Sequence, residues 1–243
     1  MIKVAVVGSR GRMGQEVVRA VEEVNDCDLV SAIDIGDGLE TLASADVIVD
    51  FTTPDAVMQT LEYCIGRGIH CVVGTTGFDG ERIDQVRAWC ADNPFVGVII
   101  APNFSVGAVL MMRFAAEASA YFESVEIIEL HHPDKVDAPS GTSRFTAEMI
   151  AESRAAAGLG AGPDATTVEA LGARGAMVDG IRIHSVRARG LVAHQEVVLG
   201  GVGETLTIRH DSLDRSSFMP GVLLAARRVR SHPGLTLGLT DYL

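Results

Sequence analysis

The sequence of 243 residues has no excess of positive charge and no long hydrophobic run. Its 20 Lys and Arg residues are outnumbered by 32 Asp and Glu residues, which gives a formal net charge of −12 at pH 7. Because binding a polyanion requires a basic surface, this balance argues against a nucleic-acid partner. No segment approaches the ~20 apolar residues of a membrane span, and the apolar run in MIKVAVVG is too short for a signal peptide. We therefore expect no membrane partner and a cytoplasmic location.

The sequence also contains no CxxC pair. Its four cysteines lie in apolar segments typical of strands and helices: Cys27, Cys64, Cys71 and Cys90. We interpret them as reduced thiols in the core of a cytoplasmic protein.

The first hundred residues alternate short Val/Ile-rich runs with amphipathic segments. The pattern predicts strands at residues 2–7, 28–34, 46–51, 70–73 and 96–101, and helices at residues 12–24, 55–67 and 80–91. Continuous apolar strands separated by helices are typical of a parallel sheet that is covered on both faces. The predicted fold class is therefore α/β, beginning with a doubly wound Rossmann-type parallel sheet over residues 1–105.

After Asn103 the pattern changes. It predicts helices at residues 106–122 and 143–157, and strands at residues 125–131, 181–188, 194–199 and 204–210. The last three strands follow one another without helices, which favours a second α+β domain, residues 106–212, built on a mixed sheet. The helical segment that begins near Leu213 is expected to return to the first domain, so that residues 213–243 form a C-terminal segment of it.

Three glycines separate the first predicted strand from the first helix. Gly8, Gly11 and Gly14 in VVGSRGRMGQEVV would permit close approach of the backbone to a pyrophosphate at the helix N-terminus. The spacing GxxGxxG does not by itself require a dinucleotide, because such glycines can be purely structural. Asp34 strengthens it, since an acid at the end of the second strand can accept hydrogen bonds from the adenosine ribose. An ordinary strand-end acid is the alternative.

Other loops of the same domain also suit a dinucleotide. FTTP at Phe51, GTTG at Gly74 and APNFS at Ala101 each follow a predicted strand. Ligands of open α/β sheets bind outside the carboxyl ends of the strands, where small hydroxyl and amide groups suit a ribose and a carboxamide. On the glycine turn, Arg10 and Arg12 could pair with the 2′-phosphate of NADPH or be solvated surface side chains.

The segment EIIELHHPDKVDAPSGT, residues 126–142, places His131, His132 and Lys135 where a strand ends. A single histidine is more often structural than catalytic, but this cluster concentrates exchangeable protons. No further Cys or His stands at ligand spacing, so no metal is predicted. The following SGTS precedes a helix, whose free N–H groups could bind a carboxylate with help from the hydroxyl of Ser140 or Thr142. The alternative, an ordinary N-cap, leaves the upstream histidines and lysine unexplained.

A hydride donor in one domain and a proton donor with carboxylate-binding groups in the other predict a reductase of a small acidic substrate. The histidine segment resembles the signature of the dihydrodipicolinate reductase family, also called 4-hydroxy-tetrahydrodipicolinate reductases, of the diaminopimelate route to lysine. The resemblance covers essentially the whole chain through GSRGRMG, DFTTP, VVGTTGF, IIAPNFSVGA, LVAHQEV and GETLTIRHDSLDRSSF, and is greatest to actinobacterial members. It implies reduction of 4-hydroxy-tetrahydrodipicolinate (dihydrodipicolinate) to tetrahydrodipicolinate, and a homotetramer formed through the second-domain sheets.

The resemblance also implies roles for individual residues. It makes His131 the proton donor and acceptor and Lys135 a second proton donor. The predicted substrate-binding residues are His132, Ser140, Gly141 and Thr142. The predicted cofactor-binding residues are Gly8, Ser9, Arg10, Gly11, Arg12, Met13, Asp34, Phe51, Gly74, Thr75, Thr76, Ala101, Pro102, Asn103 and Phe104. Some members carry an arginine directly after the acid that meets the ribose, but here Ile35 follows Asp34. We therefore expect both cofactors, NADH and NADPH, to be accepted, the latter with help from Arg10 and Arg12.

Two other functions share parts of this pattern. Another two-domain NAD(P)-dependent dehydrogenase of a small amino-acid-related substrate would have the glycine turn, but would not explain HHPDKVDAPSGT. A non-catalytic NAD(P)H sensor would need no proton donor. Oxidation of the cofactor that depends on substrate separates these possibilities.

Overall fold

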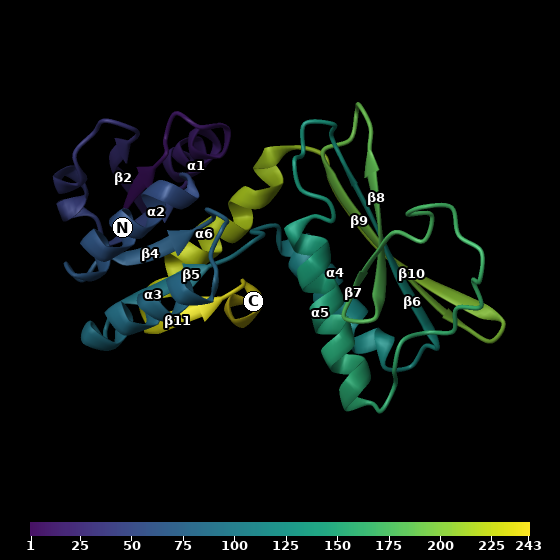
Figure 1. Cartoon of the computed structure of the whole chain (residues 1–243). Coiled ribbons are helices and arrows are strands. Elements are labelled where there is room, and N and C mark those ends of the chain that lie inside the picture. Colours follow the sequence, from purple (N-terminus) through teal and green to yellow (C-terminus); the bar gives the residue numbers. More distant parts are fainter. The chain divides into compact units, whose positions relative to one another are not determined.

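The computed structural model describes all 243 residues, and the chain divides into two compact units. Unit 1 consists of Met1–Val106 and Arg215–Leu243, and unit 2 of Gly107–Asp214. Figure 1 shows the chain coloured along its sequence, with the yellow C-terminal elements beside the blue elements of the N-terminal sheet.

Unit 1 is built on a six-stranded sheet in the order β11-β5-β4-β3-β1-β2. Its strands are β1 Ile2–Val7, β2 Cys27–Ile33, β3 Val47–Asp50, β4 His70–Val73, β5 Gly97–Ile100 and β11 Gly234–Leu237. All neighbouring pairs are parallel, which confirms the predicted Rossmann-type sheet. Strand β1 lies between β2 and β3, so the winding of the chain reverses there. In open α/β sheets, ligands bind at such a switch point.

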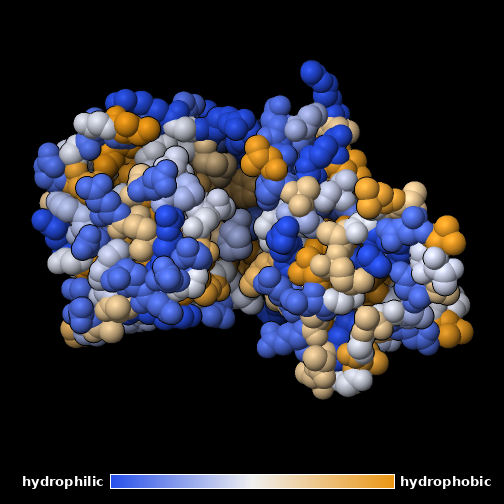
Figure 2. Space-filling view, viewed as in Figure 1, coloured by the Kyte–Doolittle hydropathy of each residue, from blue (hydrophilic) through white to orange (hydrophobic).

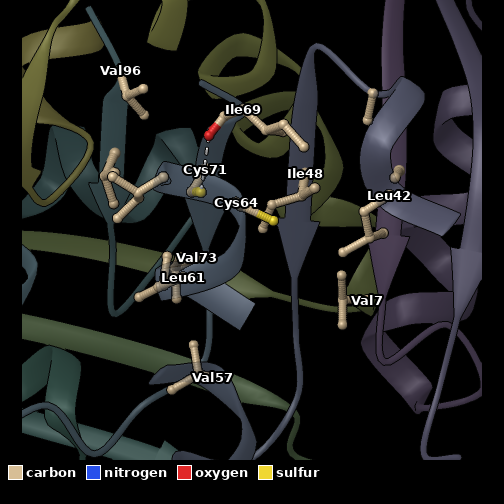
Figure 3. Packing of buried hydrophobic residues seen from close by; sticks show 14 of the residues in the cluster. Val7, Leu42, Ile48, Val57, Leu61, Cys64, Ile69, Cys71, Val73 and Val96 are labelled. Atoms are coloured by element: carbon tan, nitrogen blue, oxygen red, sulfur yellow. Dashed lines mark hydrogen bonds between the residues drawn. The ribbon is translucent and has the colours of Figure 1, made fainter. Parts of the chain in front are cut away.

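Helices cover both faces of this sheet. They are α1 Arg12–Glu22, α2 Pro54–Ile65, α3 Gly80–Asp92 and α6 Met219–Arg228, with short 3₁₀ turns η1 Leu39–Ser44, η2 Arg215–Phe218, η3 Val229–Ser231 and η4 Thr240–Tyr242. Helix α1 packs against α6, and α2 packs against α3. Buried strand residues such as Val7, Ile48 and Val73 form one core cluster with Val57 and Leu61 of α2 (Figure 3). This two-sided burial explains why the strands are continuous apolar runs in the sequence.

The four cysteines of this unit are all buried and unpaired. Two of them, Cys64 and Cys71, belong to the core cluster drawn in Figure 3. Burial raises the pKa of the Cys27 and Cys90 thiols, and it raises the pKa of Cys71 further. These three thiols are therefore protonated at neutral pH and behave as small apolar side chains.

Unit 2 contains a five-stranded mixed sheet in the order β10-β9-β6-β8-β7. Its strands are β6 Ser124–His131, β7 Ala176–Val178, β8 Ile181–Arg187, β9 Ala193–Gly201 and β10 Glu204–Ser212, and its helices are α4 Val106–Ser119 and α5 Gly141–Ala156. Strands β6 and β8 are parallel, whereas the other neighbouring pairs are antiparallel. The predicted second α+β domain with a mixed sheet is confirmed.

One face of this sheet is covered by helices. Ile127 pairs with Ile183 and Val197 on the neighbouring strands, and all three side chains are buried. On the same face, Gln195 donates a hydrogen bond of 2.7 Å to Thr146 of α5. Because side chains alternate along a strand, Glu129 and His131 lie on this face too, beyond its apolar part.

No helix of the chain combines the length and the apolar character needed to cross a membrane. On the surface drawn in Figure 2, hydrophilic residues predominate over each unit, and hydrophobic residues form scattered small groups.

Candidate active site

At the predicted glycine turn after β1, three backbone segments come into close contact. Gly8 has a φ of +82°, and a Cβ atom there would lie 2.6 Å from the carbonyl oxygen of Phe51. A Cβ atom on Gly14, in the first turn of α1, would lie 2.0 Å from the carbonyl oxygen of Gly8. Only glycine fits either position, so the loops after β1 and β3 can approach each other.

The start of helix α1 is open to an anion. Its N-cap is Gly11, and no side chain accepts a hydrogen bond from the first turn. The first backbone N–H groups of a helix have no partner within the helix, and the helix dipole favours negative charge there. The turn therefore has the donors that a pyrophosphate requires, without a competing side-chain cap.

A cavity of about 650 Å³ lies where β1, β2 and β3 end, and it is lined by Gly8, Asp34, Phe51 and Thr52 among others. The carboxylate of Asp34 accepts hydrogen bonds from the backbone N–H groups of Arg10, at 2.7 Å, and Ile35, at 2.8 Å. These two hydrogen bonds hold the pKa of Asp34 below its usual value. An ionised carboxylate at this place is a strong acceptor for ribose hydroxyls.

Asp50, which the sequence interpretation missed, connects two of the predicted cofactor loops. It is fully buried, and its Oδ1 atom accepts hydrogen bonds from Thr52 N at 3.0 Å, Thr52 Oγ1 at 2.8 Å and Thr75 Oγ1 at 2.7 Å. Burial raises the pKa of Asp50 despite these hydrogen bonds. The signal in the sequence is an acid that ends the otherwise apolar strand VIVD.

Several of the predicted cofactor-binding residues pack against one another beneath the surface of the loops. A Cβ atom on Gly74 would lie 2.0 Å from the ring of Phe51, and that ring packs edge-on against Phe104 at 5.8 Å between centroids. Phe104 and Ala101 are almost fully buried. They can therefore offer mainly backbone atoms to a ligand. The exposed members of the predicted set are Arg10, Gly11, Arg12, Thr76 and Pro102.

In unit 2, a buried glutamate holds the predicted proton donor. Nδ1 of His131 lies 2.5 Å from Oε2 of Glu129, whose side chain is fully buried. Arg187 donates to both carboxylate oxygens of Glu129, each at 2.8 Å. The parallel register places Arg187 beside His131. The three side chains form a histidine–carboxylate–arginine cluster at the ends of β6 and β8.

Glu129 is ionised in this cluster. Burial opposes its charge, but hydrogen bonds from His131, Arg187 and Ser185 lower the pKa of Glu129 to about 2. An ionised carboxylate can only accept hydrogen bonds, so Nδ1 of His131 carries a hydrogen atom and donates it to Glu129. Its other ring nitrogen, Nε2, makes no hydrogen bond within the chain and is the atom at which a proton can be exchanged. The sequence interpretation did not single out Glu129, although its E-x-H spacing places both side chains on one face of a strand.

Lys135 and the start of α5 share a carboxylate. Lys135 Nζ lies 2.6 Å from Oδ1 of Asp137. Burial opposes the charge of Asp137, but Lys135 and the backbone N–H of Gly141 lower its pKa below the usual value. Ser140 is the N-cap of α5 and accepts a hydrogen bond from Ser143 N at 3.2 Å, so its hydroxyl has a structural task.

The predicted substrate residues therefore lie along one connection between β6 and α5, residues 131–142. His132 directly follows His131 and is half-buried, and Thr142 is the second residue of α5. The roles of these residues in binding remain predictions. Across the chain, no group of three or more His, Cys, Asp or Glu side chains is placed to hold a metal ion.

Two family models match the chain. The model described as dihydrodipicolinate reductase, N-terminus, matches residues 2–104, and the model described as dihydrodipicolinate reductase, C-terminus, matches residues 107–243. Relatives named 4-hydroxy-tetrahydrodipicolinate reductase include one from Streptomyces griseus and one from Cutibacterium acnes, each 60% identical. Both alignments cover 100% of this chain, with 98% and 99% of the relatives.

A solved structure agrees with this result. A dipicolinate-bound dihydrodipicolinate reductase from Paenisporosarcina sp. TG-14 matches with a TM-score of 0.88 and 43% identity, over 100% of both chains. A probable dehydrogenase from Thermotoga maritima, with a TM-score of 0.68 and 12% identity over 99% of this chain and 92% of that one, shares the fold alone. The resemblance inferred from the sequence is confirmed, and the chain belongs to the dihydrodipicolinate reductase family of NAD(P)H-dependent oxidoreductases.

Proposed function

We propose that the protein reduces 4-hydroxy-tetrahydrodipicolinate (dihydrodipicolinate) to tetrahydrodipicolinate with NAD(P)H, as a step of diaminopimelate and lysine biosynthesis. The observation that carries the proposal is the pairing of His131 with buried, ionised Glu129, next to a lysine and a helix start in the same connection. A protein that only bound a dinucleotide would not need a proton donor held in this way.

Unit 1 has groups that fit a dinucleotide. The uncapped start of α1 suits the pyrophosphate, and the carboxylate of Asp34 suits the adenosine ribose. The loops that begin at Phe51, Gly74 and Ala101 would hold the nicotinamide end. NADH or NADPH bound there would supply a hydride. We propose that both are accepted, with NADPH relying on the arginines of the glycine turn.

Unit 2 has groups that fit a ring with two carboxylates. Lys135 offers an ammonium group, His132 an imidazole, and Gly141 and Thr142 the N–H groups at the start of α5. The related reductase from Paenisporosarcina sp. TG-14 has dipicolinate bound, and dipicolinate is such a planar dicarboxylate. In the free protein Asp137 contacts both Lys135 and the Gly141 N–H, so a substrate carboxylate would have to replace it.

The arrangement around His131 suits the proton transfer that follows hydride transfer in a reduction. A hydride added to C4 of the conjugated cyclic imine drives electrons toward the ring nitrogen, after which C3 takes up a proton. Nε2 of His131 can give that proton, and Lys135 is a second donor. Ionised Glu129 stabilises the charged imidazole, while Arg187 keeps Glu129 in place and balances its charge.

We also propose that the protein is cytoplasmic and forms a homotetramer whose subunit contacts are made by unit 2. The face of its sheet opposite the helices supports this, because Ile128, Leu130 and Val186 are not fully buried there. Partly exposed apolar side chains on a sheet face favour contact with another copy of the chain.

A coupled assay tests the proposed function. The protein is mixed with the upstream synthase, pyruvate, aspartate semialdehyde and NADH, and the loss of reduced nicotinamide is followed by absorbance. We expect oxidation only when the synthase and both of its substrates are present. Oxidation with another small amino-acid-related substrate alone would favour a different dehydrogenase. Binding of NADH without oxidation in any mixture would favour a sensor.

A further inference from the structure

We propose that Asp37 sets the preference of the protein between NADH and NADPH, by pairing with Arg10 and adding a second carboxylate to the adenosine pocket. The inference rests on the proposed binding of a dinucleotide in unit 1. It concerns an acid that the sequence interpretation did not consider, three residues after Asp34.

The position of Asp37 is well defined. Its Oδ2 atom accepts a hydrogen bond of 2.9 Å from the backbone N–H of Asp34 and lies 3.4 Å from Nη2 of Arg10. Its own backbone N–H donates to the carbonyl oxygen of Asp34 at 3.0 Å. These bonds close the turn after β2 and hold the two carboxyl groups beside each other.

Both carboxyl groups line the same cavity. Asp34 and Asp37 belong to the wall of the 650 Å³ cavity that also contains Gly8 and Gly11. A ribose with free hydroxyls needs one carboxylate as an acceptor, and Asp34 supplies it. A ribose 2′-phosphate carries close to two negative charges at neutral pH, so a second carboxylate nearby disfavours it.

Asp37 also reduces the positive charge available from Arg10. An arginine on the glycine turn is the natural partner for a 2′-phosphate, but here its guanidinium is paired. The side chains of Arg10 and Asp37 are 71% and 39% exposed, and ion pairs this exposed are weak. A phosphate can therefore take Arg10 from Asp37, so NADPH binding is weakened and not abolished. Arg12, exposed on the same turn and making no side-chain hydrogen bond or ion pair, remains a further cation for it.

The variant Asp37→Asn separates charge from loop structure. The asparagine side chain keeps an oxygen that can accept the Asp34 N–H, but it removes the negative charge and releases Arg10. We expect the variant to tighten NADPH relative to NADH by roughly 3- to 20-fold at low salt, with a smaller gain at high salt.

The experiment measures the dissociation constants of NADH and NADPH by nicotinamide fluorescence for wild type, Asp37→Asn, Arg10→Gln and the double variant. Asp28→Asn is the matched control, because it removes one exposed carboxylate from the other end of β2. The ratio of its NADPH and NADH dissociation constants should equal that of wild type. We also expect Arg10→Gln to weaken NADPH more in the Asp37→Asn background than in wild type.

The outcomes distinguish this inference from the proposed function. If wild type binds NADH but Asp37→Asn shifts both dissociation constants equally, or neither, Asp37 only closes the turn and the inference is wrong. If wild type binds neither nucleotide, the proposed dinucleotide site is wrong, and the inference that depends on it is wrong too. Asp37→Ser, which keeps a side-chain oxygen in a smaller group, gives the same readout should Asp37→Asn fold poorly.

Discussion

Glu129 and His131, two residues apart on strand β6, are joined by a 2.5 Å contact between a fully buried carboxylate and Nδ1 of the imidazole. The contact fixes which nitrogen carries hydrogen and directs proton exchange to Nε2. Arg187, from β8, completes the cluster with two bonds to the same carboxylate. Glu129 therefore acts through His131 and positions it.

Replacing Glu129 by Gln should lower kcat by roughly 10- to 10³-fold, because the amide can donate to Nδ1 and favour the wrong tautomer. Steady-state kinetics measure kcat and KM separately, and the loss should fall mainly on kcat.

A matched control lies on the opposite face of the same strand. Glu126 contacts Arg174 and, at 2.7 Å, Nε2 of His184, and thus forms a similar cluster outside the predicted substrate connection. Glu126→Gln should retain wild-type kcat. If Glu129→Gln retained wild-type kcat too, Glu129 would have no part in positioning His131.

The stability of the fold should also depend on pH through Glu129. The pKa of Glu129 falls from an ordinary value of 4.5 to about 2 on folding. A lowered pKa means that the ionised group stabilises the fold above its unfolded pKa, and that this contribution is lost as pH falls from 4.5 toward about 2. Urea denaturation at several pH values should show a flatter dependence for Glu129→Gln over that range. Its free energy of unfolding at neutral pH should be about 1–3 kcal/mol lower than that of wild type. Equal pH slopes for both proteins would contradict the ionised pair.

Asp50 should have the opposite pH dependence. Burial raises its pKa, and its Oδ2 atom has no hydrogen-bond partner. A raised pKa means that its contribution to stability is present at low pH and is lost as pH rises through the folded pKa. The free energy of unfolding of wild type, relative to Asp50→Asn, should therefore fall as pH rises above the ordinary aspartate value of 3.8. A pH-independent difference between wild type and Asp50→Asn would contradict the buried charge.

Removing the charge of Asp137 should tighten dicarboxylate binding. Asp137 contacts Lys135 and the Gly141 N–H, which are the donors proposed for a substrate carboxylate. For Asp137→Asn we expect the dissociation constant of pyridine-2,6-dicarboxylate to fall by roughly 3- to 10-fold in titration calorimetry. Asp134→Asn, an exposed site in the same connection, is the control. Weaker binding by Asp137→Asn would mean that Asp137 holds Lys135 in place for the substrate.

The sequence predicted those parts of the molecule that depend on local patterns. The strands of unit 1 are buried on both faces and therefore stand out as apolar runs, and β1 and β4 have the predicted bounds. The helix expected over residues 213–230 is divided instead into η2, α6 and η3, with Pro220 in the first turn of α6. Strands β7 and β11 were not predicted, because both are edge strands without a fully buried residue, so no continuous apolar run marks them.

The supporting residues of the site could not be predicted because their partners are distant in sequence. Glu129 meets Arg187 58 residues later, and Asp50 meets Thr75 25 residues later. Such pairs are created by strand register and loop packing, which no local spacing encodes. The group of His131, His132 and Lys135 could be recognised in the sequence because its members are neighbours in the chain.

The measurement that tests the central claim most directly is turnover of wild type and His131→Gln in the coupled assay, together with their NADH dissociation constants. We predict that kcat falls by roughly 10²- to 10⁴-fold in His131→Gln while NADH affinity changes little, because proton donation is lost and the proposed dinucleotide site is in unit 1. His184→Gln, a histidine paired with Glu126 on the other face, should keep wild-type turnover. Turnover of His131→Gln close to that of wild type would contradict the account.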